Sequence, residues 1–207
     1  MTDMKKALPL NKKQRRQQIV DSALKVFSNV GYHDAHMEDI AFQAGIGKGT
    51  LYEYFSSKEE LFKESVVTSI EAYSDILKTI YPQGKNLRQR IELLVEVHLR
   101  FCQERKSWLK LLMMNMHCFD EDLQRHIGNL HREIKNFIQK AVRESGLSNA
   151  GQAEDISLLS VMIMGVINSA NIIMFYEYED IDIGVLQRKL TGFIMNAIKQ
   201  EVHVDMT

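Results

Sequence analysis

The segment 31–61 constrains the fold of this chain more than any other part of the sequence. Its pattern predicts two short helices, at about 37–44 and about 48–55, joined by a turn at Gly45. Gly45 can take the left-handed backbone conformation that ends a helix, and the small side chain of Ala41 lets two helices approach closely. The segment therefore predicts a helix-turn-helix.

The second short helix would present a set of polar and aromatic side chains that suits DNA phosphates and base edges. Its outward residues are Lys48, Thr50, Tyr52, Glu53 and Tyr54. Lys58 opens the next helix, whose N-terminal dipole favours a phosphate. The alternative is an ordinary exposed helix that carries two tyrosines by chance.

These residues make the chain similar to the DNA-binding domain of the TetR (tetracycline repressor) family of bacterial transcriptional regulators. The matching residues are Gly31-Tyr32, Ile40-Ala41, Ala44-Gly45-Ile46, Lys48-Gly49-Thr50-Leu51-Tyr52, Phe55 and Lys58-Glu59-Glu60-Leu61. The resemblance covers roughly the first third of the chain. The chain departs from the family at Ala35 and His36, because the family usually has Thr and then Ser or Thr there. That hydroxyl caps the helix and commonly meets a DNA phosphate, a position that His36 occupies in this chain.

The resemblance implies an all-α fold with an N-terminal helix-turn-helix DNA-binding domain at 1–58 and a C-terminal ligand-binding and dimerisation domain at 59–207. It also implies that Lys48 and Gly49 lie nearest the bases. Thr50 and the two tyrosines, Tyr52 and Tyr54, would mainly bind phosphates.

Glu53 stands where the family varies its choice of DNA sequence, and two roles for it remain open. Its carboxylate can accept a hydrogen bond from a cytosine amino group. It can equally repel phosphates and select a sequence by exclusion.

Charge is distributed unevenly along the chain, although the net charge is only −1. Residues 1–58 carry a balance of +3 and the remainder a balance of −4. A basic end on an acidic body is expected of a DNA-binding domain joined to a regulatory one. The basic cluster at 12–16 would contact phosphates or simply form a solvated helix start.

Apolar periodicity predicts about nine helices and no strands. They are expected at about 12–30, 37–44, 48–55, 58–80, 87–104, 108–116, 121–144, 153–176 and 185–201. Gly31 should stop the first helix, and Asp120 should cap the seventh.

The segment 156–176 carries no charge and is long enough to span a bilayer. Serines and asparagines interrupt it, its flanks are acidic on both sides, and no basic flank sets an orientation. A helix buried on all sides therefore accounts for it better than a membrane span. The polar, basic N-terminus and the absence of a disulfide framework for Cys102 and Cys118 lead us to expect a cytoplasmic protein.

Methionines and aromatics crowd a short region in the second half of the chain. Such residues are usually core, but they also make an adaptable wall for an apolar ligand, and the resemblance implies a pocket. The candidate ligand-binding residues are Phe101, Trp108, Met113, His117, Asn168 and Asn171. His98 and Cys102, with His117 and Cys118, have a spacing that matches no established zinc pattern.

A polar stripe of serines and asparagines runs along the uncharged helix. Gly165 and Ser169 lie four residues apart and permit a close helix crossing. In the family, the last two helices pair with their mates across a two-fold axis, so these residues and Phe193 are the candidate dimerisation residues. The stripe would fix the register of the dimer or supply polar groups to the pocket, and the sequence does not separate these alternatives.

The resemblance thus implies a homodimeric, ligand-responsive regulator, and we expect a repressor that a small, largely apolar effector releases from double-stranded operator DNA. An acyl chain would suit the methionine-rich region. No cofactor, metal, catalytic group or membrane partner is expected. The main alternative is a DNA-binding regulator controlled by a protein partner, while an enzyme would require convergent ionisable groups in a pocket.

Overall fold

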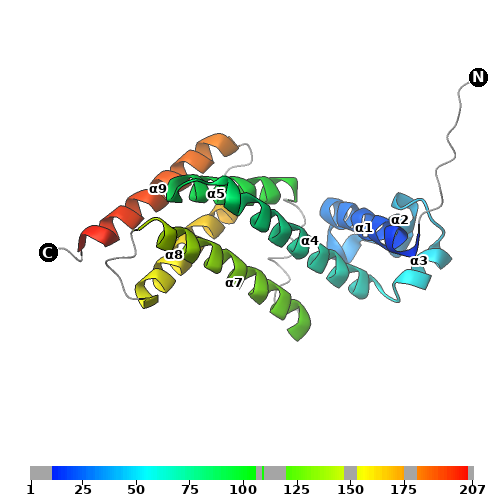
Figure 1. The fold of residues 1–207 in the computed structure, drawn as a ribbon. Coiled ribbons are helices and arrows are strands. Elements are labelled where there is room, and N and C mark those ends of the chain that lie inside the picture. Colours follow the sequence, from blue (N-terminus) through cyan, green and yellow to red (C-terminus); the bar gives the residue numbers. More distant parts are fainter. Residues whose placement is uncertain (1–10, 106–108, 110–119, 147–152, 175–180, 205–207) are drawn as a thin grey trace, which may run out of the picture. The chain divides into compact units, whose positions relative to one another are not determined.

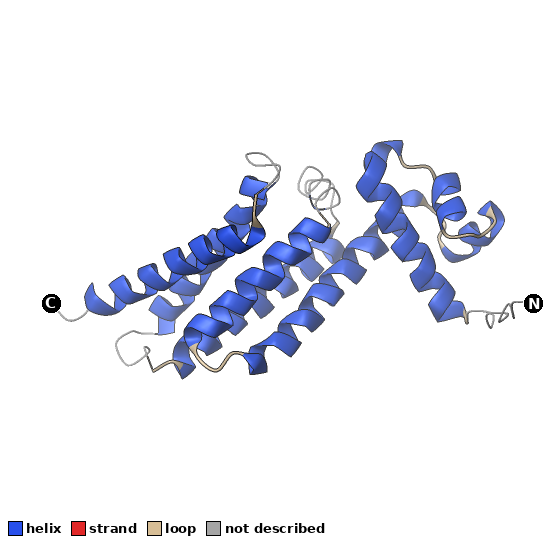
Figure 2. Ribbon diagram, turned by 90° about the horizontal axis from the view of Figure 1, so that it is seen from above, coloured by secondary structure: helices blue, strands red, loops and turns tan. Residues whose placement is uncertain are grey.

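The computed structural model describes residues 11–105, 109, 120–146, 153–174 and 181–204, and no strand occurs among them (Figures 1 and 2). The helices are α1 (Lys12–Asp34), α2 (Met37–Gln43), α3 (Lys48–Tyr54), α4 (Lys58–Ile80), α5 (Leu87–Glu104), α7 (Glu121–Glu144), α8 (Ala153–Ile172) and α9 (Ile183–Val204), with a 3-10 turn, η1 (Tyr81–Gln83), after α4. The predicted all-α class is confirmed. The helix expected at 108–116 lies, apart from Leu109, outside the described residues.

Side chains that accept hydrogen bonds from free backbone N–H groups mark several helix starts. Asn11 and Gln14 form a reciprocal capping box at α1, with N–O distances of 2.9 and 3.0 Å. Asp120 caps α7, as predicted, by accepting from the N–H of Leu123 at 3.0 Å. Each such cap stabilises its helix by about 1 kcal/mol.

Gly31 interrupts α1 at the predicted stop. Its φ of +86° and ψ of 169° leave the helical region, and the chain resumes a helical turn up to Asp34. A Cβ placed on Gly31 would meet nothing within 4 Å, so the backbone conformation is what favours glycine there.

Two compact units divide the chain, and the division falls inside α4, between Thr68 and Ser69. The start of α4 belongs to the first unit because Phe62 packs edge-on against Phe27, with ring centroids 5.4 Å apart, and against Tyr32 at 4.8 Å. The helix α4 is therefore shared by both units, and the domain boundary expected after residue 58 stays a prediction.

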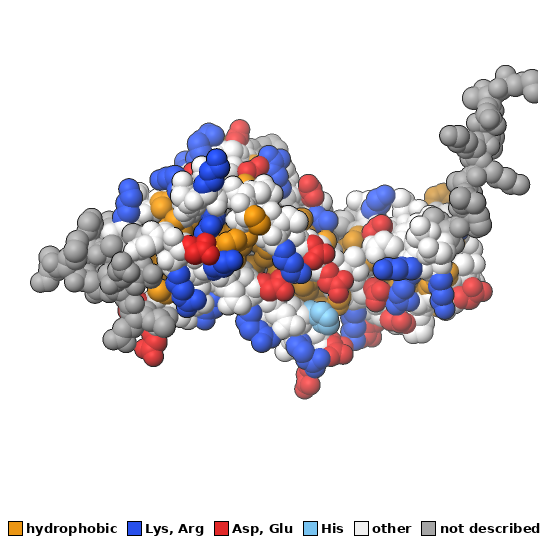
Figure 3. All heavy atoms as spheres, viewed as in Figure 1, with side chains coloured by type: hydrophobic (Ala, Val, Ile, Leu, Met, Phe, Trp, Pro, Cys, Tyr) orange, Lys and Arg blue, Asp and Glu red, His pale blue; other side chains and the backbone are white. Residues whose placement is uncertain are grey.

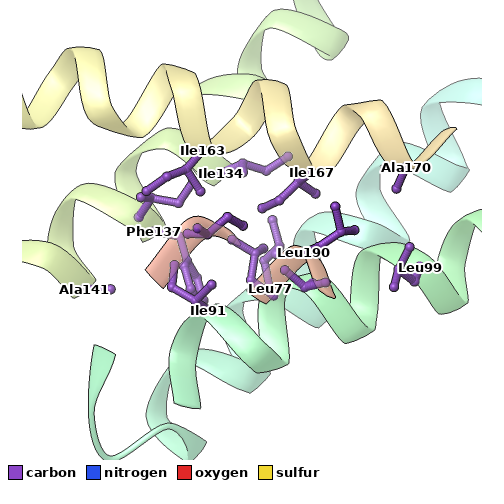
Figure 4. Packing of buried hydrophobic residues seen from close by; sticks show 14 of the residues in the cluster. Leu77, Ile91, Leu99, Ile134, Phe137, Ala141, Ile163, Ile167, Ala170 and Leu190 are labelled. Carbon is purple, nitrogen blue, oxygen red and sulfur yellow. The ribbon is translucent and has the colours of Figure 1, made fainter. Parts of the chain in front are cut away.

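The second unit is built around a single apolar core, shown in Figure 4. The end of α4 and the helices α5, α7, α8 and α9 each contribute buried side chains at helical spacing. Members of this core are Leu77, Ile91, Leu94, Leu99, Phe137, Ile138, Ile163, Ile167, Leu190 and Ile194. Fully burying one such side chain stabilises the fold by roughly 1.5–3 kcal/mol.

The helix α8 is buried on one face only, which corrects the expectation of a helix buried on all sides. Its buried side chains recur every three to four residues, and only 28% of its most apolar window is buried. By length and composition alone this helix could cross a membrane. The large side chains on its open face are Leu158, Val161, Met162 and Ile172, which are 50–62% exposed.

Candidate nucleic-acid interface and effector site

A glycine turn joins α2 to α3 and fixes the angle between them. The N–H of Gly45 donates to the carbonyl of Phe42 at 3.0 Å, and that of Ile46 donates to the carbonyl of Ala41 at 3.0 Å. This is the Schellman arrangement, in which glycine takes a positive φ, here +63°. A Cβ on Gly45 would meet nothing within 4 Å, so conformation rather than crowding calls for glycine.

The helix α3 shows one face to the core of the first unit and the other to solvent. Leu51 and the following Phe55 are fully buried. The exposed side chains are those of Lys48, Tyr52 and Glu53, with Gly49 beside them, while Thr50 and Tyr54 are half-buried. The structure thus puts the predicted DNA-binding residues of α3 together on one short helix, and their contacts with DNA stay a prediction.

Arg16 of α1 binds the C-terminal end of α3. Its Nη1 donates to the carbonyl of Tyr54 at 2.9 Å, and its Nε donates to Glu64 at 2.9 Å. The guanidinium also lies 4.2 Å from the centroid of the Phe55 ring. Arg16, grouped with the phosphate-binding cluster in the sequence, therefore positions the recognition helix, whereas Lys12 and Lys13 are exposed.

Lys58, at the start of α4, binds the C-terminal end of α1 in a similar way. Its ammonium donates to the carbonyls of Tyr32, His33 and Ala35 at 2.7, 3.0 and 3.0 Å and lies 4.7 Å from the Tyr32 ring centroid. A lysine has three donors, so all of them are used. The sequence predicts a phosphate contact for Lys58 and does not reveal this structural role, because no spacing rule links a helix start to carbonyls so far back in the chain.

Lys48 forms an ion pair with Glu38 of α2, across the glycine turn. The hydrogen bond from Lys48 lowers the pKa of the Glu38 carboxyl, and Glu38 in turn raises the pKa of the Lys48 ammonium. Sequence reasoning singled out Lys48 alone and missed Glu38. The face of the molecule drawn in Figure 3 likewise mixes Lys and Arg side chains with Asp and Glu side chains.

His36 occupies the N-cap of α2 but makes no side-chain cap hydrogen bond. It is exposed, and the backbone N–H groups of Asp39 and Ile40 donate to its carbonyl at 3.1 and 3.2 Å. The acidic side chains of Glu38 and Asp39 complement the helix dipole at this end instead. The phosphate contact expected of His36 stays a prediction.

A chain of polar side chains crosses the core of the second unit. The hydroxyl of Tyr73 lies 3.2 Å from Nδ1 of His98, and Nε2 of His98 lies 3.5 Å from Sγ of Cys102. The thiol donates to Oδ1 of Asn171 at 2.9 Å, and the ring of Phe101 packs edge-on against Tyr73 at 4.8 Å. These groups come from α4, α5 and α8.

Burial keeps this cluster uncharged. It lowers the pKa of His98 to about 4, although the hydrogen bond with Asn171 opposes that shift. It raises the pKa of the Cys102 thiol to about 12 and that of the Tyr73 hydroxyl still further. A thiol with such a pKa is a poor nucleophile and a poor metal ligand at neutral pH.

The predicted ligand-binding residues divide into three groups. Phe101 and Asn171 meet at the polar cluster, and both are half-buried. Asn168 is on the exposed face of α8 instead, one turn before Asn171. Trp108, Met113 and His117 lie outside the described residues.

A separate open groove of about 370 Å³ runs between α4 and α7. Its lining combines acidic side chains, among them Glu71, Asp75 and Glu133, with the apolar side chains of Ile70 and Leu130. It differs from the predicted apolar pocket in both place and chemistry.

The candidate dimerisation residues lie on the outer side of the second unit. Gly165 is exposed, and a Cβ on it would meet nothing within 4 Å. Phe193 is 63% exposed on α9. Ser169 is half-buried and donates to the carbonyl of Val166 at 2.7 Å. Within the part of the chain that the structure describes, no three acidic, histidine or cysteine side chains cluster around a possible metal.

Comparison with known proteins gives a family match within the first unit and relatives that span both units. Residues 19–65 match the family described as bacterial regulatory proteins, tetR family. Over 193 residues the chain is 23% identical to the fatty acid metabolism regulator protein of Bacillus subtilis, covering 90% of this chain and 97% of that protein.

Solved structures share the fold across both units. The transcriptional regulator FadR from Bacillus subtilis, in complex with stearoyl-CoA, superposes with a TM-score of 0.71 at 20% identity, covering 86% of this chain and 96% of that one. A tetR-family regulator from Streptomyces coelicolor gives a TM-score of 0.77 at 18% identity, covering 95% and 91%.

Proposed function

Because this chain belongs to the TetR family of bacterial transcriptional regulators, we propose that it is a homodimeric repressor that leaves its operator when a largely apolar effector binds the second unit. The observation that carries DNA binding is the Gly45 turn, which holds α3 with its polar residues outward. A regulator of this family works on DNA in the cytoplasm.

In this mechanism, the two α3 helices of a dimer enter successive major grooves, roughly 34–36 Å apart. Lys48 and Gly49 at the start of α3 approach base edges, while Thr50, Tyr52 and Tyr54 bind phosphates and fix the register. Arg16 and Lys58 contribute by positioning, because Arg16 binds the C-terminal end of α3 and Lys58 binds the end of α1.

The effector site is proposed at the cluster of Tyr73, His98, Cys102 and Asn171, beside Phe101. The cluster is neutral and lies in an apolar core, so it suits an apolar molecule with one or two uncharged polar groups. An acyl chain fits this description, and the name of the Bacillus subtilis relative supports it. The charged head of an acyl thioester would stay near solvent.

Coupling between the sites runs through α4, which is shared by both units. An effector that binds better to one arrangement of α4 shifts the half-site spacing, and DNA affinity falls by the differential binding energy. The effector needs to change the spacing of the two α3 helices only enough that they no longer fit successive major grooves.

The test is operator affinity measured by fluorescence anisotropy during titration with stearoyl-CoA and with the free fatty acid. We expect the Kd for the operator to rise by about tenfold or more. Phe101→Ala should weaken this response while leaving operator affinity unchanged, and Ile76→Ala, an exposed residue of α4, should respond as the wild type does. Operator binding that no apolar compound alters would favour control by a protein partner.

A further inference from the structure

We propose that Glu38 and Lys48 act together as a composite reader of one G·C base pair in each operator half-site, with Lys48 facing the guanine and Glu38 the cytosine. The inference rests on the proposed binding of α3 in the major groove. It adds Glu38, a residue of α2, to the groups that determine sequence specificity.

The geometry brings an acceptor and a donor side by side. Glu38 stands in the first turn of α2, and Lys48 is the first residue of α3, so the ion pair bridges the two helices of the motif. Both side chains are 56% exposed, which leaves the outer edge of the pair open. A carboxylate has about four acceptor sites and an ammonium has three donors, so both groups can take a further partner while still paired.

The edge of a G·C pair in the major groove is complementary to this arrangement. Guanine offers two adjacent acceptors, N7 and O6, and cytosine offers the N4 amino donor next to them. Lys48 would donate to the guanine, and Glu38 would accept from the cytosine. An A·T pair has no two adjacent acceptors on the purine, and its thymine presents the O4 acceptor, which would repel the carboxylate, where cytosine presents the N4 donor.

Pairing also changes how Lys48 responds to the rest of the DNA. A lone lysine is attracted to every phosphate, which adds affinity without sequence information. Glu38 offsets that charge, and the pKa of Glu38, lowered by Lys48, keeps the carboxylate ionised at neutral pH. Removing Glu38 should therefore lower the preference for the G·C pair and raise the affinity for DNA of any sequence.

The experiment selects bound sequences from a random duplex library with the full-length wild type, Glu38→Met and Lys48→Met. The wild type should select G·C at one position of each half-site. In both variants, the preference for G·C over the other base pairs at that position should fall about tenfold. In addition, Glu38→Met should steepen the dependence of log K on log salt by about one unit, because Lys48 becomes free to bind a phosphate.

The matched control is Asp39→Leu, which removes a neighbouring exposed carboxylate of α2 that forms no ion pair in the described structure. It should raise affinity for all sequences alike and leave the G·C preference intact. Glu38 and Lys48 are exposed, and both a surface ion pair and a charge at a helix end contribute little to stability, so Glu38→Met should unfold only slightly below the temperature of the wild type.

Two results would overturn the composite reader while leaving operator binding intact. In one, Glu38→Met keeps the G·C preference of the wild type. In the other, the wild type selects A·T at the position where Lys48→Met loses its preference. A wild type that enriches no sequence would overturn operator binding itself, and the inference with it.

Discussion

At the scale of single residues, three basic side chains of the first unit bind groups of the protein itself. Lys58 uses all three donors on carbonyls at the end of α1, and Arg16 binds the last carbonyl of α3. Lys48 is paired with Glu38. The positive balance of this part of the chain is therefore an unreliable guide to how many phosphates it contacts.

Replacing Lys58 with methionine should destabilise the first unit by about 1–3 kcal/mol, because three carbonyls lose a charged donor. Sequence-specific DNA binding should fall with it. The measurements are urea unfolding and operator affinity at several salt concentrations, with Lys25→Met, an exposed lysine of α1, as the control. If Lys58 only bound a phosphate, stability would be unchanged and the salt slope would drop by about one unit.

His98 should make stability depend on pH. Its pKa is about 4 in the folded protein and near 6.5 when unfolded, so the unfolded state takes up the proton first as pH falls. The contribution of neutral His98 to the free energy of unfolding is complete above pH ~6.5 and is lost as the pH falls from there to ~4. The loss between pH 7 and pH 5 is about 2 kcal/mol.

The measurement is urea unfolding at these two pH values for the wild type and for His98→Gln, which cannot titrate. The variant should lose about 2 kcal/mol less than the wild type on acidification. Equal losses in both proteins would mean that His98 is not buried in its neutral form.

At the scale of elements, the α2–α3 motif depends on one backbone conformation. Gly45 has a φ of +63° and open space where a Cβ would stand. A β-branched residue rarely adopts such a φ, and forcing it there costs roughly 1–3 kcal/mol.

Gly45→Val should therefore reduce operator affinity at least tenfold while the protein remains dimeric, as measured by anisotropy and analytical ultracentrifugation. Gly128→Ala in α7 is the matched control, since a Cβ there also meets nothing within 4 Å but needs no positive φ. It should keep full affinity. Normal operator binding by Gly45→Val would mean that this turn does not set the position of α3.

Helix ends were predictable from sequence where a single residue determines them. Gly31, Gly45 and Asp120 mark their boundaries through conformations or caps that residue type alone suggests. Side-chain partners were not predictable, because Lys58 and Arg16 bind groups that only tertiary folding brings near. No local pattern encodes such contacts.

The uncharged helix α8 shows the same limit. Asn168 and Asn171 lie three residues apart in the same polar stripe, yet Asn171 meets Cys102 and Asn168 faces outward. The repeat of polar residues did not reveal which side of the stripe the core would cover.

At the scale of the whole molecule, α8 and α9 expose large apolar side chains. Leu158, Val161 and Met162 are exposed on α8, and Phe193 is exposed on α9. Exposed apolar side chains grouped on two neighbouring helices are typical of an interface, and we expect a second copy of the chain to cover them with the same face.

Gly165→Arg and Phe193→Arg should each yield monomers by sedimentation, because a buried charge would be left unpaired at the interface. Gly165 is exposed and a Cβ there would meet nothing within 4 Å, so each chain should still fold. Operator affinity should fall about a hundredfold, since a single half-site lacks avidity. Phe42→Arg, at a position that is 87% exposed in the first unit, should stay dimeric. A wild type that sediments as a monomer at micromolar concentration would contradict this assignment.

The central claim, that this chain is a dimeric regulator reading a specific operator, is tested most directly by sequencing the genomic DNA fragments that the purified protein retains. The account predicts enrichment of an inverted repeat whose half-site centres lie about one helical turn apart, roughly 34–36 Å. Retention of fragments with no shared sequence, or of a shared sequence without inverted symmetry, would contradict it.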